Sequence, residues 1–431
     1  MFTYWLEMRR WHSRLVRQHS EQKDTSAPRY TGLISFGHFQ PATFISACHL
    51  STSGRSVVIP LSMLSGNLDQ VELKLGKVVG KHWKVCSRLG SGGCGTVFLV
   101  EDINTRSKAA LKAESHNIPG GSVLKLEVQV LRRLEGRKHV PQLLRAGKKE
   151  AYSYMVMTLL GDNIEKLFRL CHKQFSISTQ VRLGIHILFA LKQLHEVGFL
   201  HRDVKPANLA LGIGEHDSRV VYLLDFGFAR EFIYSGDGRV ELRRERFRVH
   251  FRGTARYCSA RTHHRKEQGR CDDLWSLFYV VAEFRGPLPW ANTSNRNEVA
   301  SLKETMPDVR LLSRSPSQLL DIPTHLRELG YYDRPDYLRI FHAFEAVLEA
   351  QGIRFYDPYD WELEPSYKKT VPNTSVRTIE STSTDRPFDS NRQKGSDRSN
   401  RPNSLESPTT ESKEDVAGYK IEDFKKNELG F

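Results

Sequence analysis

The sequence predicts an α+β fold in which a hairpin is followed along the chain by helices. Residues 95–102, GTVFLVED, are rich in β-branched and aromatic side chains and lead into a turn, INTRS, as the strand of a hairpin does. Residues 121–136, GSVLKLEVQVLRRLEG, and residues 181–198, VRLGIHILFALKQLHEVG, carry apolar side chains at helical spacing. Strands and helices are therefore both expected.

The chain is long enough to bury one large core. It has 431 residues, of which 39% are hydrophobic. A membrane helix needs roughly 20 consecutive apolar residues, and the longest candidate, residues 275–284, is interrupted by Glu283. We therefore expect no membrane span.

The N-terminus and the cysteines favour an intracellular protein. Residues 1–20 carry arginines where a secretory signal peptide needs an apolar run. The six cysteines form no CxxC pair and have no regular spacing, which indicates reduced thiols rather than a zinc site or a disulfide framework. We expect the protein in the cytoplasm and also in the nucleus.

Composition divides the chain into three parts. Residues 1–73 are expected to be a mostly irregular extension, whose first twenty residues are either loosely ordered or a short basic amphipathic helix. Residues 74–363 form the globular part and carry most of the formal net charge of +14. Residues 364–431 are rich in Ser, Thr, Asn, Pro and charge, so we expect a disordered tail that cannot bury enough apolar surface to fold.

A glycine-rich segment gives the first indication of phosphate binding. Residues 88–102 contain GxGxxG at Gly90, Gly92 and Gly95, a pattern that also marks dinucleotide-binding folds. In those folds the last glycine opens a helix, whereas here a strand follows. The segment is therefore interpreted as a hairpin whose backbone N–H groups can approach phosphate oxygens. Lys112, at the end of the next strand, could grip a phosphate or could be a solvated strand end.

Glu127 occupies an unusual position in the helix predicted at 121–136. It shares the apolar stripe with Leu124 and Leu131. A carboxylate on such a face must find a cation or bear a desolvation cost, and Lys112 is the natural candidate. The alternative is a glutamate at the edge of the stripe that turns to solvent.

The stretch 200–212, LHRDVKPANLALG, places a carboxylate, an ammonium and an amide on one short loop. These groups belong to Asp203, Lys205 and Asn208, and the triplet Asp-Phe-Gly follows at 225–227. A lysine, a helix glutamate, HRDxxxxN and DFG in this order and spacing are hard to reach by chance, and together they indicate phosphoryl transfer.

This ordered set resembles the eukaryotic protein kinases over about residues 76–363. Within them the chain is similar to the casein kinase 1 group, because the usual APE triplet is missing and residues 251–290 contain GTARY, CDDLWSL and LPW. GFLHRDVKPAN, GRCDDLWSLFY and YDPYDWE resemble its tau-tubulin kinase branch. Arg261 and Cys94 depart from the group, which usually has an asparagine and an aromatic residue there.

The resemblance implies a protein kinase domain at 74–363 with two lobes. The small lobe would be a mainly antiparallel β-sheet with one key helix, and the larger lobe would be mainly helical. The implied activity is transfer of the γ-phosphoryl group of ATP, with Mg²⁺, to Ser/Thr hydroxyls of proteins.

The resemblance also assigns roles to residues. Asp203 would accept the hydroxyl proton and Lys205 would steady the transferred group. Asn208 and Asp225 would bind Mg²⁺. Lys112, held by Glu127, would bind the α- and β-phosphates. The implied ATP-binding residues are Leu89, Gly90, Ser91, Gly92, Gly93, Cys94, Gly95, Val97, Ala110, Lys112, Met157, Thr158 and Leu160.

Residues 238–257, GRVELRRERFRVHFRGTARY, are strongly basic. Only Glu241 and Glu245 offer local counter-charges to the seven arginines, which are Arg239, Arg243, Arg244, Arg246, Arg248, Arg252 and Arg256. This segment is either a solvated basic face or a field for anionic substrates. The resemblance implies an anion site at Arg202 and Arg256, so the expected partners are acidic or phosphorylated protein segments, cytoskeletal proteins among them, and we expect a monomer.

Two other functions remain open. A pseudokinase scaffold keeps the fold without the reaction, although such proteins usually lose Lys112, Asp203, Asp225 or a loop glycine, and none is lost here. A polyanion or nucleic-acid binder would suit the pI of about 9.4, but the chain has no recognised nucleic-acid module. We therefore expect no specific nucleic-acid partner.

Overall fold

The computed structural model describes residues 47–52, 55–60, 70–92, 95–117, 122–214, 217–236, 239–367, 415–416 and 419–431. The chain divides into two units, Met1–Asn67 and Leu68–Phe431. In the first unit, β1 (Ala47–Thr52) pairs with β2 (Arg55–Pro60) in an antiparallel hairpin. The extension was expected to be mostly irregular, so this hairpin was not predicted. The two interpretations of residues 1–20 concern a segment outside the described residues.

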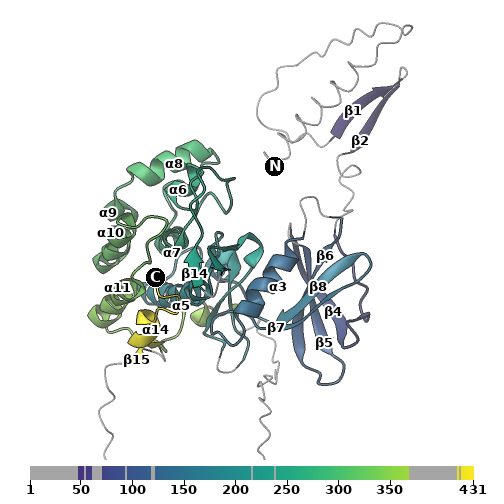
Figure 1. Ribbon diagram of the computed structural model, residues 1–431, viewed down its shortest axis with the longest axis horizontal. Coiled ribbons are helices and arrows are strands. Elements are labelled where there is room, and N and C mark those ends of the chain that lie inside the picture. The colour runs from purple at the N-terminus through teal and green to yellow at the C-terminus, as the bar shows by residue number, and fades with distance from the viewer. Residues whose placement is uncertain are drawn as a thin grey trace, which may run out of the picture. The chain divides into compact units, whose positions relative to one another are not determined.

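The second unit begins with an antiparallel sheet, the small lobe, drawn in blue in Figure 1. Its strand order is β3-β4-β5-β6-β8-β7, and the sheet is antiparallel throughout. The bounds are β3 (Val78–Val79), β4 (Trp83–Gly92), β5 (Gly95–Asp102), β6 (Lys108–Ser115), β7 (Leu143–Lys148) and β8 (Tyr152–Thr158). Val71 and Leu73 lie in the core of this sheet, so the folded part begins before the predicted boundary at residue 74.

One helix, α3 (Leu124–Arg133), lies between β6 and β7 in the chain, as predicted. Its hydrophobic face buries Leu124, Val130 and Leu131. The buried carboxylate of Glu114, on β6, accepts hydrogen bonds from the backbone nitrogens of Val123 and Leu124, at 3.0 and 2.9 Å. Glu114 thus satisfies N–H groups that have no partner within the helix, and it ties the start of α3 to the sheet.

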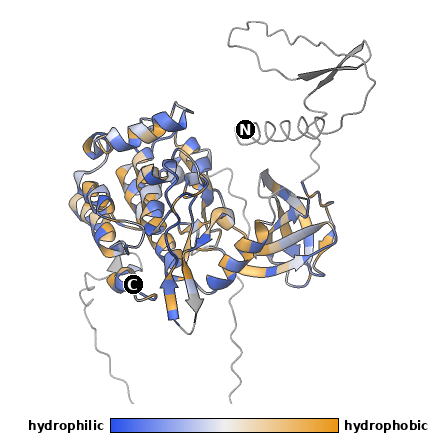
Figure 2. Cartoon of the chain, turned by 45° about the horizontal axis from the view of Figure 1, so that its top comes forward, coloured by the Kyte–Doolittle hydropathy of each residue, from blue (hydrophilic) through white to orange (hydrophobic). Residues whose placement is uncertain are grey.

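The large lobe is mainly helical. Its helices alternate hydrophobic and hydrophilic residues, the pattern of segments that turn one side to a core (Figure 2). Its helices are α4 (Ile164–Leu170), α5 (Ile177–Glu196), α6 (Ala260–His263), α7 (Arg270–Glu283), α8 (Arg296–Thr305), α9 (Asp308–Leu311), α10 (Asp321–Arg327), α11 (Tyr337–Gln351), α12 (Asp360–Leu363) and α14 (Ile421–Lys425).

Helix α5 is the centre of this lobe and is buried along nearly its whole length. Its buried Arg182 donates to the carbonyl oxygens of Phe355 and Pro358, at 3.2 and 3.0 Å, and stacks on the ring of Tyr359. A buried guanidinium is tolerated because these partners replace its water. The YDPYDWE segment is thereby fixed to α5.

Short two-stranded pairings hold the loops that connect the helices. β9 (Phe199–Leu200) pairs with β12 (Arg230–Glu231), and β10 (Leu209–Leu211) pairs with β11 (Val221–Leu223). β13 (Ile233–Gly236) pairs with β14 (Arg239–Leu242). Because the first two pairings flank residues 201–208 and 224–229, they set the positions of both motif-bearing loops. These loops are the site described below.

The prediction that residues 364–431 are disordered is wrong for part of this segment. Residues 364–367 continue the fold after α12, and β15 (Asp415–Val416) pairs with β16 (Tyr419–Lys420) ahead of α14. Tyr419 and Phe424 are buried in the core of the large lobe. The low average hydrophobicity of the tail hid these two aromatic residues. Among the described residues, no helix combines the length and apolar character needed to cross a bilayer.

Candidate active site

The glycine-rich segment forms the hairpin between β4 and β5, as predicted. Gly92 pairs with Gly95 at its end. Gly95 has a φ of +113°, and a Cβ there would lie 2.4 Å from the carbonyl oxygen of Ala113. A Cβ on Gly90 or Gly92 would meet no atom within 4 Å. Packing and backbone conformation therefore require glycine at position 95, whereas at 90 and 92 the bare backbone is open to a ligand.

Lys112 and Glu127 meet inside the small lobe. Both are buried, and Lys112 Nζ forms an ion pair with Oε1 of Glu127. Lys112 Nζ also lies 3.4 Å from Oδ1 of Asp225. The predicted partnership is confirmed, and the alternative of a glutamate turned to solvent is wrong. Strand, helix and DFG loop therefore converge on one ammonium group.

Burial raises the pKa of Glu127 to about 7, although the ammonium of Lys112 lowers it; the neighbouring carboxylates of Asp225 and Glu114 raise it further. At Asp225 the neighbouring charges outweigh burial, and the pKa is lowered. Burial would raise the pKa of this carboxyl, but Lys112 and His201 keep it below its usual range. At neutral pH Asp225 is therefore ionised, as a metal ligand must be, while Glu127 is close to its midpoint.

Asp203, Lys205 and Asn208 lie together on the loop after β9. The buried carboxylate of Asp203 accepts hydrogen bonds from Lys205 Nζ and Thr254 Oγ1, both at 2.6 Å. Asn208 Nδ2 donates to the carbonyl oxygen of Asp203 at 2.9 Å. Because the amide nitrogen is used in this way, Oδ1 is the Asn208 atom available to a cation. Thr254 was not predicted, although it lies in the GTARY motif.

Asp273, on α7, binds the backbone of the loop that carries Asp203. This role was not predicted from the sequence. Asp273 is buried, and Oδ2 accepts from the backbone nitrogen of His201 at 2.8 Å. Oδ1 accepts from the backbone nitrogen of Arg202 at 2.7 Å, and His195 Nε2 lies 2.9 Å from Oδ2. Arg202 has a φ of +66°, an uncommon conformation for a residue with a side chain. Asp273 stabilises this conformation immediately before Asp203.

The residues present fit a magnesium ion. The backbone nitrogen of Leu224 donates to the carbonyl oxygen of Asn208 at 2.9 Å, so the two segments that carry Asn208 and Asp225 are joined. Asp225 has a φ of +61°, and its side chain is 36% exposed. A carboxylate and an amide oxygen are hard ligands of the kind that Mg²⁺ prefers. When bound, the ion would neutralise charge on phosphate oxygens.

The predicted adenine site follows β8 and the strands beside it. Met157 and Thr158 lie at the end of β8, and Ala110 pairs with Met157 across β6 and β8. The backbone nitrogen of Thr158 donates to Gln142 at 3.0 Å. The N–H of Thr158 is therefore engaged within the protein.

The other predicted ATP-binding residues lie on or beside the same strands. Leu89 and Ser91 are exposed on β4, and Val97, on β5, pairs with Lys112. Leu160 follows β8 at the start of the connection to α4. Gly93 and Cys94 lie outside the described residues.

The two arginines of the predicted anion site, Arg202 and Arg256, each bind groups of the protein itself. Arg202 Nε donates to the carbonyl oxygen of Phe228 at 2.7 Å, and burial lowers its pKa to about 10, so it stays protonated at neutral pH. Arg256 forms an ion pair with Glu283 at 2.8 Å and donates to the carbonyl oxygen of Ala291. In the part of the chain that the structure describes, each guanidinium is bound by its own surroundings.

The arginine-rich segment also has counter-charges that its local sequence did not reveal. Arg243 pairs with Glu231 at 3.3 Å, and Arg246 pairs with the buried Glu267. Glu231 and Glu267 lie outside the segment, so they add to its local counter-charges, Glu241 and Glu245. The exposed arginines of the segment are a smaller set, namely Arg239, Arg244, Arg246, Arg248 and Arg252.

The two lobes and the converging lysine, carboxylates and amide form the arrangement that phosphoryl transfer requires. Residues 83–335 match the model of the protein kinase domain, and the chain belongs to the protein kinase family. Its relatives place it among the serine/threonine kinases.

The chain is 45% identical to K06H7.1 of Caenorhabditis elegans, named as a candidate serine/threonine-protein kinase, over 70% of this chain and 88% of that protein. It is 34% identical to the serine/threonine-protein kinase spe-6 of C. elegans, over 65% of this chain and 75% of that protein. It is 40% identical to the inactive tau-tubulin kinase ttbk-6 of C. elegans, over 56% of this chain and 87% of that protein.

Proposed function

We propose that this protein is an active Ser/Thr kinase of the casein kinase 1 and tau-tubulin kinase type, which uses Mg²⁺ and ATP. The observation that carries the proposal is the carboxylate of Asp203, which is held by Lys205 and Thr254 at 2.6 Å each. An inactive relative leaves the pseudokinase as the alternative. The complete arrangement around Asp203, Lys112 and Asp225 favours the enzyme.

The proposed reaction is an in-line phosphoryl transfer. Asp203 accepts the proton of the substrate hydroxyl while the hydroxyl oxygen forms a bond to the γ-phosphorus of ATP. The bond between the γ-phosphorus and the oxygen that bridges it to the β-phosphate breaks, and ADP is released. Lys205, beside Asp203, stabilises the transferred group. Lys112, held by Glu127, positions the α- and β-phosphates, and Asn208 and Asp225 supply the oxygens for the metal.

The direct test is phosphorylation by the purified full chain. We expect ³²P transfer from ATP to Ser- and Thr-containing peptides, little transfer to matched Tyr peptides, and loss of transfer when EDTA removes Mg²⁺. A pseudokinase would transfer no phosphate to any peptide at saturating ATP and Mg²⁺. Binding of ATP without transfer would likewise refute the proposed activity.

We expect the activity to depend on the ionisation of Glu127. Below its pKa of about 7, protonated Glu127 no longer holds Lys112, so kcat/KM should fall by about tenfold per pH unit. The sign for stability is opposite. The contribution of Glu127 to folding is fully present below pH 4.5 and is lost as the pH rises through 7, because the folded chain retains the proton longer.

Profiles of kcat/KM from pH 6 to 8.5 check this expectation. Glu127→Gln is neutral at every pH, so its activity should be low throughout and the acid limb should disappear. The exposed Glu165→Gln is a matched control that should keep the acid limb. An acid limb that persists in Glu127→Gln would show that another group controls it.

We also propose that acidic or pre-phosphorylated segments, of cytoskeletal proteins among others, are preferred as substrates. The support is the exposed guanidiniums of Arg244, Arg248 and Arg252. Arg252 is two residues from Thr254, whose hydroxyl contacts Asp203, so the basic segment leads directly to a residue that holds the proposed base. Exposed charges each contribute modestly and are weakened by salt.

Substituting Arg244, Arg248 and Arg252 together by alanine should lower the preference for an acidic over a neutral peptide about tenfold at low salt. The neutral-peptide kcat should stay unchanged, and Arg310→Ala, an exposed arginine on α9, is the control. Arg256→Ala is a poor probe because it leaves Glu283 without its cation. Equal kcat/KM of the wild type for acidic and basic peptides would refute the proposed preference.

A further inference from the structure

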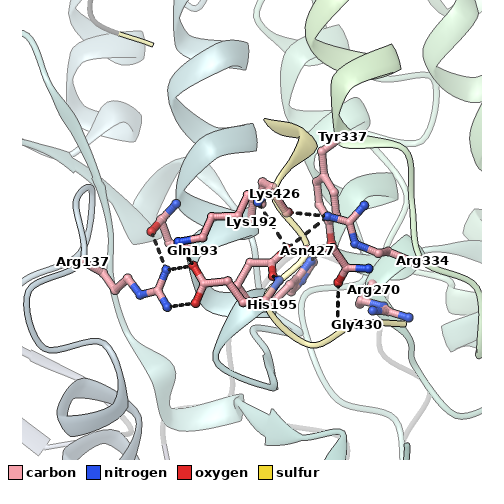
Figure 3. Close-up of polar contacts among 12 residues, drawn as sticks. Arg137, Lys192, Gln193, His195, Arg270, Arg334, Tyr337, Lys426, Asn427 and Gly430 are labelled. Atoms are coloured by element: carbon pink, nitrogen blue, oxygen red, sulfur yellow. Dashed lines mark hydrogen bonds and ion pairs between the residues drawn. The ribbon is translucent and has the colours of Figure 1, made fainter. Parts of the chain in front are cut away.

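The C-terminal residues 419–431, the C-terminal clamp, return to the large lobe and pack on it (Figure 3). Phe424, on α14, stacks on the ring of Phe341 with centroids 4.3 Å apart. Tyr419 packs against Phe189 and Phe355. Tyr419 and Phe424 are 5% and 1% exposed. Buried aromatic side chains of this size contribute on the scale of core residues, so the clamp is anchored as part of the fold.

The hydroxyl group of Tyr419 joins the clamp to the loop that follows α3. It lies 2.9 Å from Nε2 of His139 and 2.5 Å from Nδ1 of His186. Nδ1 of His139 donates to the carbonyl oxygen of Val221 at 2.8 Å, so its Nε2 accepts from the Tyr419 hydroxyl. His186 then donates to the Tyr419 oxygen. The chain of hydrogen bonds connects the clamp, the loop after α3 and β11.

Glu428 makes a second connection to the same loop. Both of its carboxylate oxygens accept from the guanidinium of Arg137, in a bidentate pair that includes Nη1 to Oε1 at 2.5 Å. Arg137 holds the pKa of Glu428 at about 2, so the pair remains charged at neutral pH. Bidentate pairs of arginine and carboxylate are geometrically specific. Arg137 and Glu428 are therefore a directed contact rather than a general attraction.

The rest of the clamp binds a buried charged cluster on α5. The backbone nitrogen of Glu428 donates to Oε2 of Glu196 at 2.5 Å. Arg334 bridges Oε1 of Glu196 and the carbonyl oxygen of Lys426, at 3.1 and 2.8 Å. Lys192 lies 3.2 Å from Glu196. The dashed lines in Figure 3 follow these bonds from Arg137 across α5 to Arg334. The clamp thus completes the hydrogen bonding of a buried carboxylate.

The loop held by the clamp adjoins the elements that carry the catalytic residues. Arg137 and His139 lie between α3, which carries Glu127, and β7. His139 also accepts a hydrogen bond at its backbone oxygen from Leu223, two residues before Asp225. The loop is therefore joined to α3 and to β11, the two elements that lead to the partners of Lys112. The clamp is connected to Glu127 through the loop and α3. It is connected to Asp225 through the loop and β11.

We propose that the C-terminal clamp is an intramolecular activating element, which positions α3 and Glu127 by holding Arg137 and His139. The proposal rests on the proposed kinase function for its activity readout. Arg137 and Glu428 are positioning residues, because neither contacts Lys112, Asp203 or Asp225 in the structure. A segment that packed merely for stability could bind any face of the lobe, whereas this one bonds to the loop that ends α3.

Charge reversal in the full chain tests the proposal. Arg137→Glu and Glu428→Arg should each lower kcat about tenfold with little change in the KM for peptide, and the double variant should recover most of the loss. Lys425→Glu is the matched control, since this exposed residue of α14 contacts only the exposed Glu422 within the described residues. Glu428→Gln, which keeps the shape, should have a smaller effect in the same direction.

A second readout does not depend on phosphate transfer. Hydrogen–deuterium exchange of residues 124–141 should rise in the single variants, return in the double variant and stay unchanged in Lys425→Glu. If the wild type transfers no phosphate, the proposed function fails while the exchange data still decide whether the clamp orders α3. Unchanged exchange with unchanged kcat, or higher kcat in the single variants, would overturn the clamp as an activating element. Loss of kcat without recovery in the double variant would also overturn it.

Discussion

Substituting Asp203 by asparagine will lower kcat for peptide phosphorylation about a thousand-fold, within the range that a positioned general base contributes. The amide side chain would retain the size of the carboxylate but could not take up the proton of the substrate hydroxyl. It would also lie against the ammonium of Lys205 and the hydroxyl of Thr254, which now both donate to the carboxylate. The KM for ATP should change little, because Lys112 and Asp225 remain.

Single-turnover ³²P transfer with the full chain measures this loss. Asp308→Asn, which changes a carboxylate that pairs with Arg327 away from the loop, is the control and should keep the wild-type rate. Thermal unfolding of the two variants should be similar to that of the wild type. A rate for Asp203→Asn within tenfold of the wild type would mean that another group accepts the proton.

Removing the carboxylate of Asp273 should have the largest effect on stability. Asp273→Ala leaves the backbone nitrogens of His201 and Arg202 without acceptors inside the protein, and it removes the partner of His195. Each buried donor left unpaired costs about 1–3 kcal/mol, so we expect a loss of about 3–5 kcal/mol in the free energy of unfolding. Activity should fall as well, because Arg202 would no longer be held in its strained conformation beside Asp203.

Urea unfolding followed by circular dichroism measures the change. Asp273→Asn retains one oxygen acceptor, so it should lose less stability than Asp273→Ala. Asp308→Ala breaks the partly exposed ion pair with Arg327 and should cost less than about 1 kcal/mol. A loss of the same size in Asp273→Ala and Asp308→Ala would show that the three bonds to Asp273 contribute little.

Asp203→Asn tests the residue proposed to react, whereas Asp273→Ala tests a residue that holds the loop in place. Asp203 was identified from the sequence, because the spacing of HRDxxxxN places a carboxylate, an ammonium and an amide on one loop. Asp273 was within a quoted motif, CDDLWSL, yet nothing in the motif says which aspartate turns to the loop. In the structure it is far along the chain from its partners, His201 and Arg202. The local sequence therefore identified the residue proposed to react, Asp203, but not Asp273, the residue that positions its loop.

The amino-acid sequence by itself determined the elements whose signals are local. β-Branched and aromatic residues after the glycines, followed by a turn, placed the hairpin of β4 and β5, and apolar residues at helical spacing placed α3 with Glu127 on its inner face. The order of the lysine, glutamate, HRDxxxxN and DFG motifs identified the protein kinase fold. These features depend on neighbouring residues, so a single chain displays them directly.

Only the tertiary structure decided the contacts between distant segments. The tail was expected to be disordered because its composition is polar on average, but Tyr419 and Phe424 find a complementary apolar surface and are buried. The pairs of Arg246 with Glu267 and Arg137 with Glu428 were equally invisible in the local charge pattern. Such contacts depend on which faces the packed helices present to one another, and the burial of Tyr419 and Phe424 overrides the polar preference of their own segment.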